Sequence, residues 1–207
     1  MLCADVIELT GRAAELLVLP DFTRAGVRVL RPARPAVVLG SGQSLSVVAD
    51  PPSGVDVVQR RTGGGAVWVD DTIVWMDVIV PRGHQRWDDD VARATFWIGQ
   101  IWAELLGGDV HHGPLVKTSW SRSVCFGGLG PGEVTVGGRK VVGVSQRRTR
   151  DGALFQCGVL LHWDPSALCA ALALPAEAEA QLANVATGTT VSVIEAGAAR
   201  LTSELAT

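Results

Sequence analysis

The sequence predicts an α+β domain in which helices pack on one side of a mostly antiparallel or mixed sheet. Short apolar segments bounded by glycine, proline and aspartate turns fill residues 27–80 and recur over 133–163. Helical periodicity is confined to residues 88–106 and 166–205. Strands and helices that occur in separate runs are typical of this class.

The first run of strands is expected at 27–30, 36–39, 55–59, 66–69 and 72–80. Pro32 and Pro35 separate the first two strands, and the third strand ends at an arginine–glycine loop. The last two strands of this run are predicted to form a hairpin that turns at Asp70 and Asp71.

A helix is expected to follow, from Asp88 to Leu106. Its first three residues are acidic and can cap the N-terminus, and Gly107 can end it. One apolar face is formed by residues that recur every three or four positions: Val91, Ala94, Ile98, Ile101, Trp102 and Leu105.

A meander of strands is predicted at 133–136, 139–146 and 154–163. The pairs Gly137-Gly138 and Asp151-Gly152 stand where tight hairpin turns need residues that tolerate positive φ. Helices are expected at 166–172, 177–185 and 191–205. We expect these elements to form a single domain over residues 1–207.

The composition limits the function. Apolar residues make up 47% and charged residues 19% of the 207 residues, which indicates a folded globular chain. The net charge of −3 argues against broad binding to nucleic acid. The apolar runs are broken well before the roughly 20 residues that a membrane-spanning helix needs, and no secretory signal is recognisable. We expect no nucleic-acid partner and no membrane association.

The four cysteines are Cys3, Cys125, Cys157 and Cys169. They form no C-x-x-C pair and have no histidine at ligand spacing, so zinc and a disulfide framework are both poor interpretations. Reduced thiols in a cytoplasmic protein fit best, and no metal site is predicted.

Two segments carry the chemistry. Residues 60–67 (RRTGGGAV) place a triglycine loop behind two arginines, and residues 138–143 (GRKVVG) place Lys140 at the start of an apolar strand. A glycine loop lets backbone N–H groups approach an anion, and arginine grips phosphate or carboxylate with two donors. A lysine adds a compact, mobile positive charge. The combination favours a site that holds and transfers an activated acyl group.

The two segments resemble those of the lipoate–protein ligase A family, within the biotin and lipoate protein ligase group. Residues 60–70 are similar to its R-R-x-[ST]-G-G-G-A-V-x-H-D signature, and residues 138–148 to its G-R-K-[IV]-x-G-[SN]-A-Q-R block, whose lysine is catalytic. Residues 37–43 (VVLGSGQ) and 155–161 (FQCGVLL) are similar to two further strands of that family.

The resemblance implies a fold like that of class II aminoacyl-tRNA synthetases and biotin–lipoate ligases. It assigns Lys140 as a catalytic residue, and it places the following residues in the substrate site: Gly40, Gln43, Arg60, Arg61, Thr62, Gly63, Gly64, Gly65, Ala66, Gly143, Ser145 and Gly158. The resemblance also implies that the acyl group is accepted by a lipoyl domain of the 2-oxoacid dehydrogenase E2 or glycine cleavage H protein type.

In the ligase reaction implied by the resemblance, ATP and Mg²⁺ would activate lipoate as an acyl-adenylate before transfer. Several departures weigh against this route. Val69 replaces the histidine of the first signature, Gln156 and Cys157 replace paired histidines, and the accessory C-terminal domain of longer ligases is not expected in this chain.

A rival reaction follows from Cys125, which lies fifteen positions before Lys140 in a C-F pair. Related cysteine-dependent octanoyltransferases carry such a pair at a similar distance. Cys125 would then be a catalytic nucleophile that takes octanoyl from acyl carrier protein, with Lys140 stabilising the oxyanion and without any cofactor. The alternative role for Cys125 is that of a small buried apolar residue.

Two further alternatives remain at this point. The departures from the family pattern are also compatible with a non-catalytic paralogue that binds acyl groups. A biotin ligase is less favoured, because the G-R-G-R-x-G-R-x-W signature is absent. The ligase and transferase interpretations both require Lys140 and the triglycine backbone to face one cavity long enough for a fatty chain.

Overall fold

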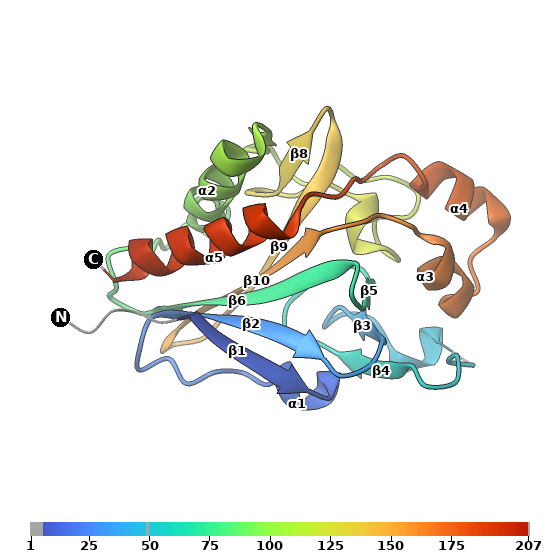
Figure 1. The fold of residues 1–207 in the computed structure, drawn as a ribbon, viewed down its shortest axis with the longest axis horizontal. Coiled ribbons are helices and arrows are strands. Elements are labelled where there is room, and N and C mark those ends of the chain that lie inside the picture. Colours follow the sequence, from blue (N-terminus) through green and yellow to red (C-terminus); the bar gives the residue numbers. More distant parts are fainter. Residues whose placement is uncertain (1–5, 49, 207) are drawn as a thin grey trace.

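The computed structural model describes residues 6–48 and 50–206, which form a large and a small sheet with helices around them (Figure 1). In spatial order the large sheet contains β1 (Val6–Gly11), β2 (Gly26–Pro32), β6 (Ile73–Pro81), β10 (Gly152–Leu160), β9 (Arg139–Arg148), β8 (Val134–Val136) and β7 (Asp109–Val110). Only the β1–β2 pair is parallel among these described strands, so the mixed, mostly antiparallel sheet of the prediction is confirmed.

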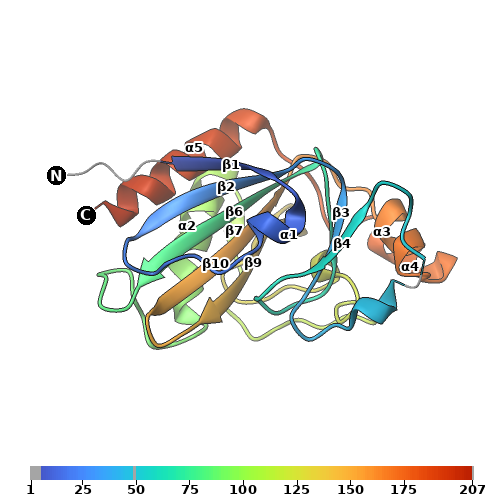
Figure 2. The same ribbon diagram turned by 90° about the horizontal axis from the view of Figure 1, so that it is seen from below.

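The small sheet has the order β4 (Asp56–Gln59), β3 (Ala36–Leu39) and β5 (Val67–Val69). It packs beneath the large sheet, on the face turned away from the long helices (Figure 2). The predicted hairpin at Asp70 and Asp71 is therefore wrong. Strand β5 pairs with β3 in the small sheet, whereas β6 pairs with β2 and β10 in the large one. The aspartates mark a crossing between sheets, which local turn chemistry cannot distinguish from a hairpin.

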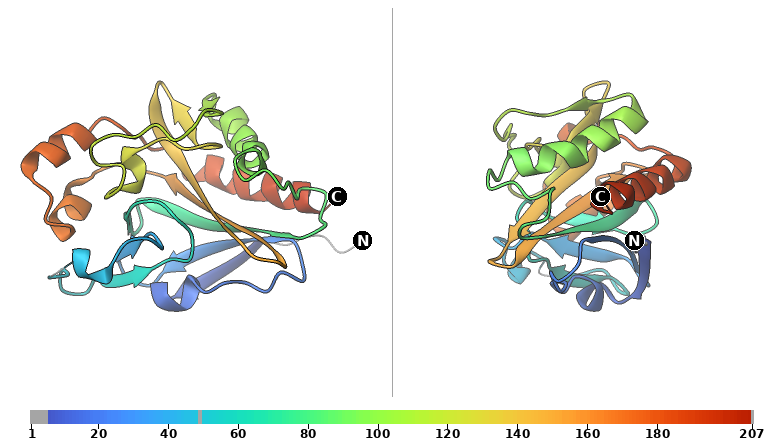
Figure 3. Two further views of the ribbon diagram at one scale, coloured as in Figure 1. Left: turned by 180° about the vertical axis from the view of Figure 1, so that it is seen from behind. Right: turned by 90° about the vertical axis from the view of Figure 1, so that its left-hand side faces the viewer.

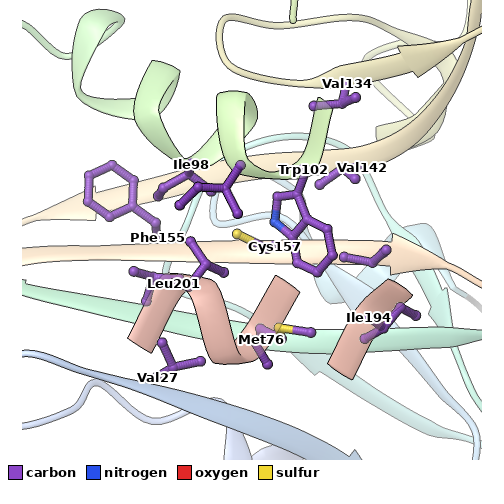
Figure 4. Packing of buried hydrophobic residues seen from close by; sticks show 14 of the residues in the cluster. Val27, Met76, Ile98, Trp102, Val134, Val142, Phe155, Cys157, Ile194 and Leu201 are labelled. Carbon is purple, nitrogen blue, oxygen red and sulfur yellow. The ribbon is translucent and has the colours of Figure 1, made fainter. Parts of the chain in front are cut away.

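Helices α2 (Phe96–Leu106) and α5 (Val191–Leu205) cover the other face of the large sheet. Figure 4 shows Trp102 of α2 and Leu201 of α5 packed over side chains of the central strands. The helices approach closely because Gly197 of α5 has no side chain: a methyl group there would lie 2.2 Å from the Trp102 ring. This interface forms the main core.

Helix α2 begins later than predicted. Asp90 accepts hydrogen bonds from the N–H groups of Ala92 and Arg93 and so forms a separate turn, and a 3-10 turn (Arg93–Thr95) then leads into α2 at Phe96. Val91, which was expected on the apolar helix face, is 55% exposed. The predicted end is confirmed, since Gly107 caps the helix with a φ of 63°.

The remaining elements lie at the ends of the molecule. Short helices α3 (Ser166–Ala171) and α4 (Ala176–Leu182) pack beside the small sheet, far from the two termini (Figure 3). Strand β1 and the one-turn helix α1 (Ala13–Leu16) were not predicted, and Cys3 lies outside the described residues. Within residues 6–48 and 50–206, no helix has the length and apolarity to cross a membrane.

Candidate functional site

Arg60 lies beneath the triglycine loop and holds it by its carbonyl groups. The side chain follows β4 and is 1% exposed. One guanidinium nitrogen donates to Gly63 O at 2.6 Å and to Gly65 O at 3.0 Å, and the other donates to Val38 O at 3.3 Å. The guanidinium also lies over the Trp75 ring at 5.6 Å. Burial lowers the pKa of Arg60 from its ordinary value, and the neighbouring Cys125 opposes that shift. Arg60 therefore has a structural position under the loop, whereas Arg61 is exposed beside it.

The loop also packs against the turn after β3. Gly64 has a φ of 99°, and its carbonyl oxygen lies so close to Gly40 that a methyl group added at Gly40 would be 1.8 Å from it. Gln43 braces the same turn, because its Oε1 accepts from Gly40 N at 2.9 Å and its Nε2 donates to Ser123 O at 3.1 Å. In the described chain the exposed N–H groups of Gly63 and Gly64 have no hydrogen-bond acceptor. They can therefore donate to a ligand.

Cys125 joins the triglycine loop to the strand that carries Lys140. Its N–H donates to Ala66 O at 2.9 Å, while Ala66 N donates to Ser123 O at 2.8 Å. The sulfur of the half-buried thiol lies 4.0 Å from Arg60 Nη2, and a methyl group added at Gly64 would be 3.6 Å from it. The thiol therefore sits at the base of the glycine loop.

Lys140 lies on the other side of Cys125 and reaches its backbone rather than its thiol. The ammonium donates to Cys125 O at 3.1 Å and to Gly128 O at 3.0 Å. It also lies 5.0 Å from the centre of the Phe126 ring and 2.6 Å from Glu133 Oε2. Gly143 leaves room for the aliphatic stem, since a methyl group there would be 3.4 Å from Lys140 Cε. The side chain is 3% exposed.

Glu133 is the residue of this site that the sequence reasoning missed. Its carboxylate accepts from Gly130 N at 2.6 Å and from Val144 N at 3.2 Å besides pairing with Lys140. The turn at Gly137 and Gly138 was the available signal. A hairpin with that turn brings the residue before β8 close to the start of β9, and a lone acid there is a natural partner for a buried lysine.

The other expected residues lie in the same region. Thr62 is buried at the start of the loop, where its hydroxyl donates to Gln156 Oε1 at 2.7 Å and accepts from Ser145 Oγ at 2.9 Å. Gly158 of β10 faces Phe126, because a methyl group at Gly158 would lie 3.7 Å from that ring. The structure thus brings Arg60, Gly64, Ala66, Lys140 and Gly158 together around Cys125 and Phe126, whereas no contact with these two residues is seen for Arg61 or Ser145 in the described chain.

The sequence led us to expect an open cavity between Lys140 and the triglycine loop, but in the described structure the Lys140 ammonium does not face open space. The space around the ammonium is filled by Cys125, Phe126, Gly128 and Glu133. Two cavities lie elsewhere on the described chain: one of about 480 Å³ is lined by the loop after β2 with Asp70 and Asp71, and one of about 400 Å³ by the segment before β2. A substrate at Lys140 therefore has to displace some of these contacts.

The local chemistry combines a nucleophile with hydrogen-bond donors. Cys125 is partly accessible, whereas Cys157 and Cys169 are buried in apolar clusters. Burial raises the pKa of both buried thiols, and Asp77 adds to the effect at Cys157. Of the described cysteines, Cys125 alone is placed to react, beside a guanidinium and two free N–H groups.

Comparisons with known proteins identify the family and the fold. A family profile described as the lipoyl protein ligase A/B catalytic domain matches residues 20–203. A search among curated proteins finds no match.

Several solved structures share the fold. A crystal structure of lipoate-protein ligase A bound with ATP has a TM-score of 0.68 at 17% identity, over 98% of this chain and 85% of that one. A structure from an archaeal lipoylation system, described as a bi-partite lipoate protein ligase and its E2 lipoyl domain from Thermoplasma acidophilum, has a TM-score of 0.64 at 18% identity, over 98% of this chain and 83% of that one. Protein Ta0514 of T. acidophilum has a TM-score of 0.70 at 18% identity, over 98% of this chain and 85% of that one.

Proposed function

The chain belongs to the lipoyl protein ligase A/B catalytic domain family, and we propose that it transfers a lipoyl or octanoyl group to the acceptor lysine of a lipoyl domain. The position of Cys125 carries the proposal. Its thiol lies at the base of the triglycine loop, and its carbonyl oxygen is bound by the buried Lys140. Acyl transfer needs a nucleophile, donors for an oxyanion and a fixed geometry, and these residues supply all three.

The geometry favours the thioester route over the ATP route that the best sequence motifs suggest. In the thioester route the Cys125 thiolate attacks the carbonyl carbon of an octanoyl thioester on acyl carrier protein. A new carbon–sulfur bond forms, and the carrier leaves as a thiolate. The lipoyl-domain lysine, as a free amine, then attacks the acyl-cysteine, so that an amide forms and the Cys125 thiolate is released. The amine gives up one proton to solvent or to the departing thiolate.

The residues have distinct tasks in both steps. The N–H groups of Gly63 and Gly64 would donate to the developing oxyanion. Arg60 fixes the Gly64 N–H group, because it holds the Gly63 carbonyl of the same peptide group, and Ser41 N holds the Thr62 carbonyl of the peptide group that carries the Gly63 N–H. Lys140 holds the turn that begins at Cys125, and it must release a carbonyl or Glu133 before its ammonium can reach a substrate.

The ATP-dependent ligase is the second candidate, and the free donors support it. The N–H groups of Gly63 and Gly64 and the exposed guanidinium of Arg61 fit the phosphates of a nucleotide. A relative of the same fold was solved with ATP bound. When bound, ATP with Mg²⁺ would supply the leaving group that activates the carboxylate of lipoate. Cys125 would then have only a packing role.

The acceptor is proposed from the family and from one relative. The T. acidophilum ligase is described as part of a lipoylation system together with its E2 lipoyl domain. We therefore take lipoyl domains of the E2 type, or the related H protein of glycine cleavage, as the acceptor of this chain.

Intact-mass measurement of a lipoyl domain separates the candidates. The protein is incubated with octanoyl–carrier protein in one reaction and with lipoate and MgATP in another. Modification by the carrier donor that is lost in Cys125→Ala supports the thioester route. Modification that needs ATP and survives Cys125→Ala supports the ligase. If neither reaction modifies the domain while the protein is folded, the proposal fails and the chain is a non-catalytic acyl-binding paralogue.

A further inference from the structure

A row of polar side chains crosses the large sheet at one level. The strand register places Arg28 of β2 opposite Asp77 of β6, Asp77 opposite Gln156 of β10, and Gln156 opposite Ser145 of β9. Cross-strand neighbours on one face are close enough to bond directly. The row faces the small sheet, because its neighbour Trp75, two positions from Asp77, packs in the core on that side.

Each member of the row is bonded to the next one, and Thr62 bridges Gln156 and Ser145. Arg28 pairs with Asp77, and Gln156 Nε2 donates to Asp77 Oδ1 at 2.9 Å. Gln156 Oε1 accepts from the Thr62 hydroxyl at 2.7 Å, and Thr62 accepts from Ser145 Oγ at 2.9 Å. Asp77 is 0%, Thr62 0% and Gln156 3% exposed, so water cannot replace these bonds.

The carboxyl group of Asp77 determines which groups donate and which accept along the row. Asp77 accepts from both Arg28 and Gln156, so the amide of Gln156 has to turn its NH₂ group toward Asp77. Its oxygen then faces Thr62 and can only accept, which obliges the Thr62 hydroxyl to donate to it. An apolar residue at position 156 would remove one hydrogen bond from each neighbour, so that Asp77 keeps only Arg28 and Thr62 keeps only Ser145.

The row ends at the glycine loop. Thr62 directly precedes Gly63, and its backbone oxygen accepts from Ser41 N at 2.9 Å in the turn that packs under the loop. Arg60 holds the carbonyl groups on the inner side of the loop, but it does not contact the Thr62 side chain. The row therefore holds the entrance of the loop from the large sheet, independently of Arg60.

We infer that Gln156 and Thr62 are positioning residues, which transmit the fixed position of the Arg28–Asp77 pair to the triglycine loop over Cys125. Neither residue reaches the thiol. They act by holding in place the peptide groups of Gly63 and Gly64, whose N–H groups have no acceptor in the described chain. The inference concerns the loop itself and is tested without any acyl substrate, so it stands or fails separately from the proposed reaction.

The test measures how fast Cys125 is alkylated by iodoacetamide, with the modified peptide quantified by mass spectrometry. Gly64 lies over the thiol, so a loop that has lost its anchor should expose the sulfur. Thr62→Val and Gln156→Leu each remove two of these hydrogen bonds and should accelerate alkylation at least about fivefold, the factor expected for the net loss of one buried hydrogen bond. Thr62→Ser keeps the hydroxyl and should retain the wild-type rate.

Thr202→Val is the matched control. Thr202 is also buried and hydrogen bonded, to Ala198 O at 2.8 Å, but it lies in α5 on the opposite face of the large sheet. It should leave the alkylation rate of Cys125 unchanged. Wild-type rates in folded Thr62→Val and Gln156→Leu overturn the inference, and so does a Thr62→Ser rate equal to that of Thr62→Val. If Gln156→Leu does not fold, the comparison of valine with serine at position 62 decides.

Discussion

Lys140 Nζ lies 2.6 Å from Glu133 Oε2, with the two side chains only 3% and 7% exposed. The pair links β9 to the residue before β8, across a hairpin whose turn is formed by two glycines with positive φ. Two charges at this depth are stable only together, because each partner offsets the desolvation of the other. The ion pair thus gives Lys140 a structural role in addition to any chemical one.

Loss of Glu133 should destabilise the fold strongly. Glu133→Ala leaves the Lys140 ammonium buried without an anionic partner, which costs about 3–5 kcal/mol of unfolding free energy. Urea denaturation followed by tryptophan fluorescence measures the loss. Exposed Glu179→Ala is the control and should change stability by less than about 0.5 kcal/mol. The double variant Glu133→Leu/Lys140→Met should recover much of the loss, and a double variant no better than Glu133→Ala would show that the pair is not the cause.

Activity should depend on one of the two lysines of the chain. Lys140→Met should lower the rate of acyl transfer to a lipoyl domain at least about 100-fold, since it removes both the bonds that hold the turn at Cys125 and the positive charge that would reach the substrate. Lys117→Met is the matched control, because Lys117 is exposed and lies outside the site. It should keep the wild-type rate. Equal rates for Lys140→Met and wild type would remove Lys140 from the mechanism.

Gly40 and Gly42 provide a second matched pair within one turn. Gly40→Ala places a methyl group 1.8 Å from the carbonyl oxygen of Gly64, so the triglycine loop must move. Gly42→Ala meets no atom within 4 Å. We expect Gly40→Ala to abolish transfer and lower the melting temperature, and Gly42→Ala to do neither. Activity retained in Gly40→Ala would show that the loop position is unimportant.

The sequence predicted local features well and long-range contacts poorly. Strand β3 and helix α5 have the predicted bounds, because apolar patterning and helix boundaries are encoded within each segment. The separation of β5 and β6 into different sheets was missed, since the same alternation suits either partner.

The same distinction between local features and long-range contacts holds for the site. The motifs located Lys140, Cys125 and the glycine loop, which meet in the structure. Glu133 was missed because its pairing with Lys140 depends on the hairpin across Gly137 and Gly138, and a single acid before a strand indicates no partner until that hairpin is considered. The near-complete burial of Lys140 was not predicted either, because Phe126 and Gly128, which surround it, belong to a loop whose path the sequence does not reveal.

The described cysteines should differ sharply in reactivity. Burial raises the pKa of Cys157 and of Cys169, so both remain protonated and inaccessible at pH 8 in the folded protein. Cys125 is half-buried and should be alkylated. Peptide mass spectrometry after iodoacetamide treatment should find the label at Cys125 and not at the two buried thiols. All three should react in urea, which controls for detection, whereas label at native Cys157 would contradict the packing of the core.

Asp77 and Asp56 should affect stability with opposite dependence on pH. Burial raises the pKa of Asp77 above its ordinary 3.8, although Arg28 and Gln156 act against the shift. The folded state then binds the proton more tightly than the unfolded state, so the contribution of Asp77 to stability falls as the pH rises from about 4 through its folded pKa. At Asp56 the hydrogen bond from Arg12 lowers the pKa, so its contribution is present above 3.8 and is lost as the pH falls.

Unfolding free energies of wild type, Asp77→Asn and Asp56→Asn, measured from pH 3.5 to 7, test both signs. Relative to Asp77→Asn, the wild type should lose stability as the pH rises, whereas relative to Asp56→Asn it should gain stability. If the wild type gains stability with rising pH in both comparisons, then Arg28 and Gln156 lower the pKa of Asp77 more than burial raises it. The polar row would then be anchored by a carboxylate that is more stable ionised than in water, and Gln156 would be held to it still more firmly.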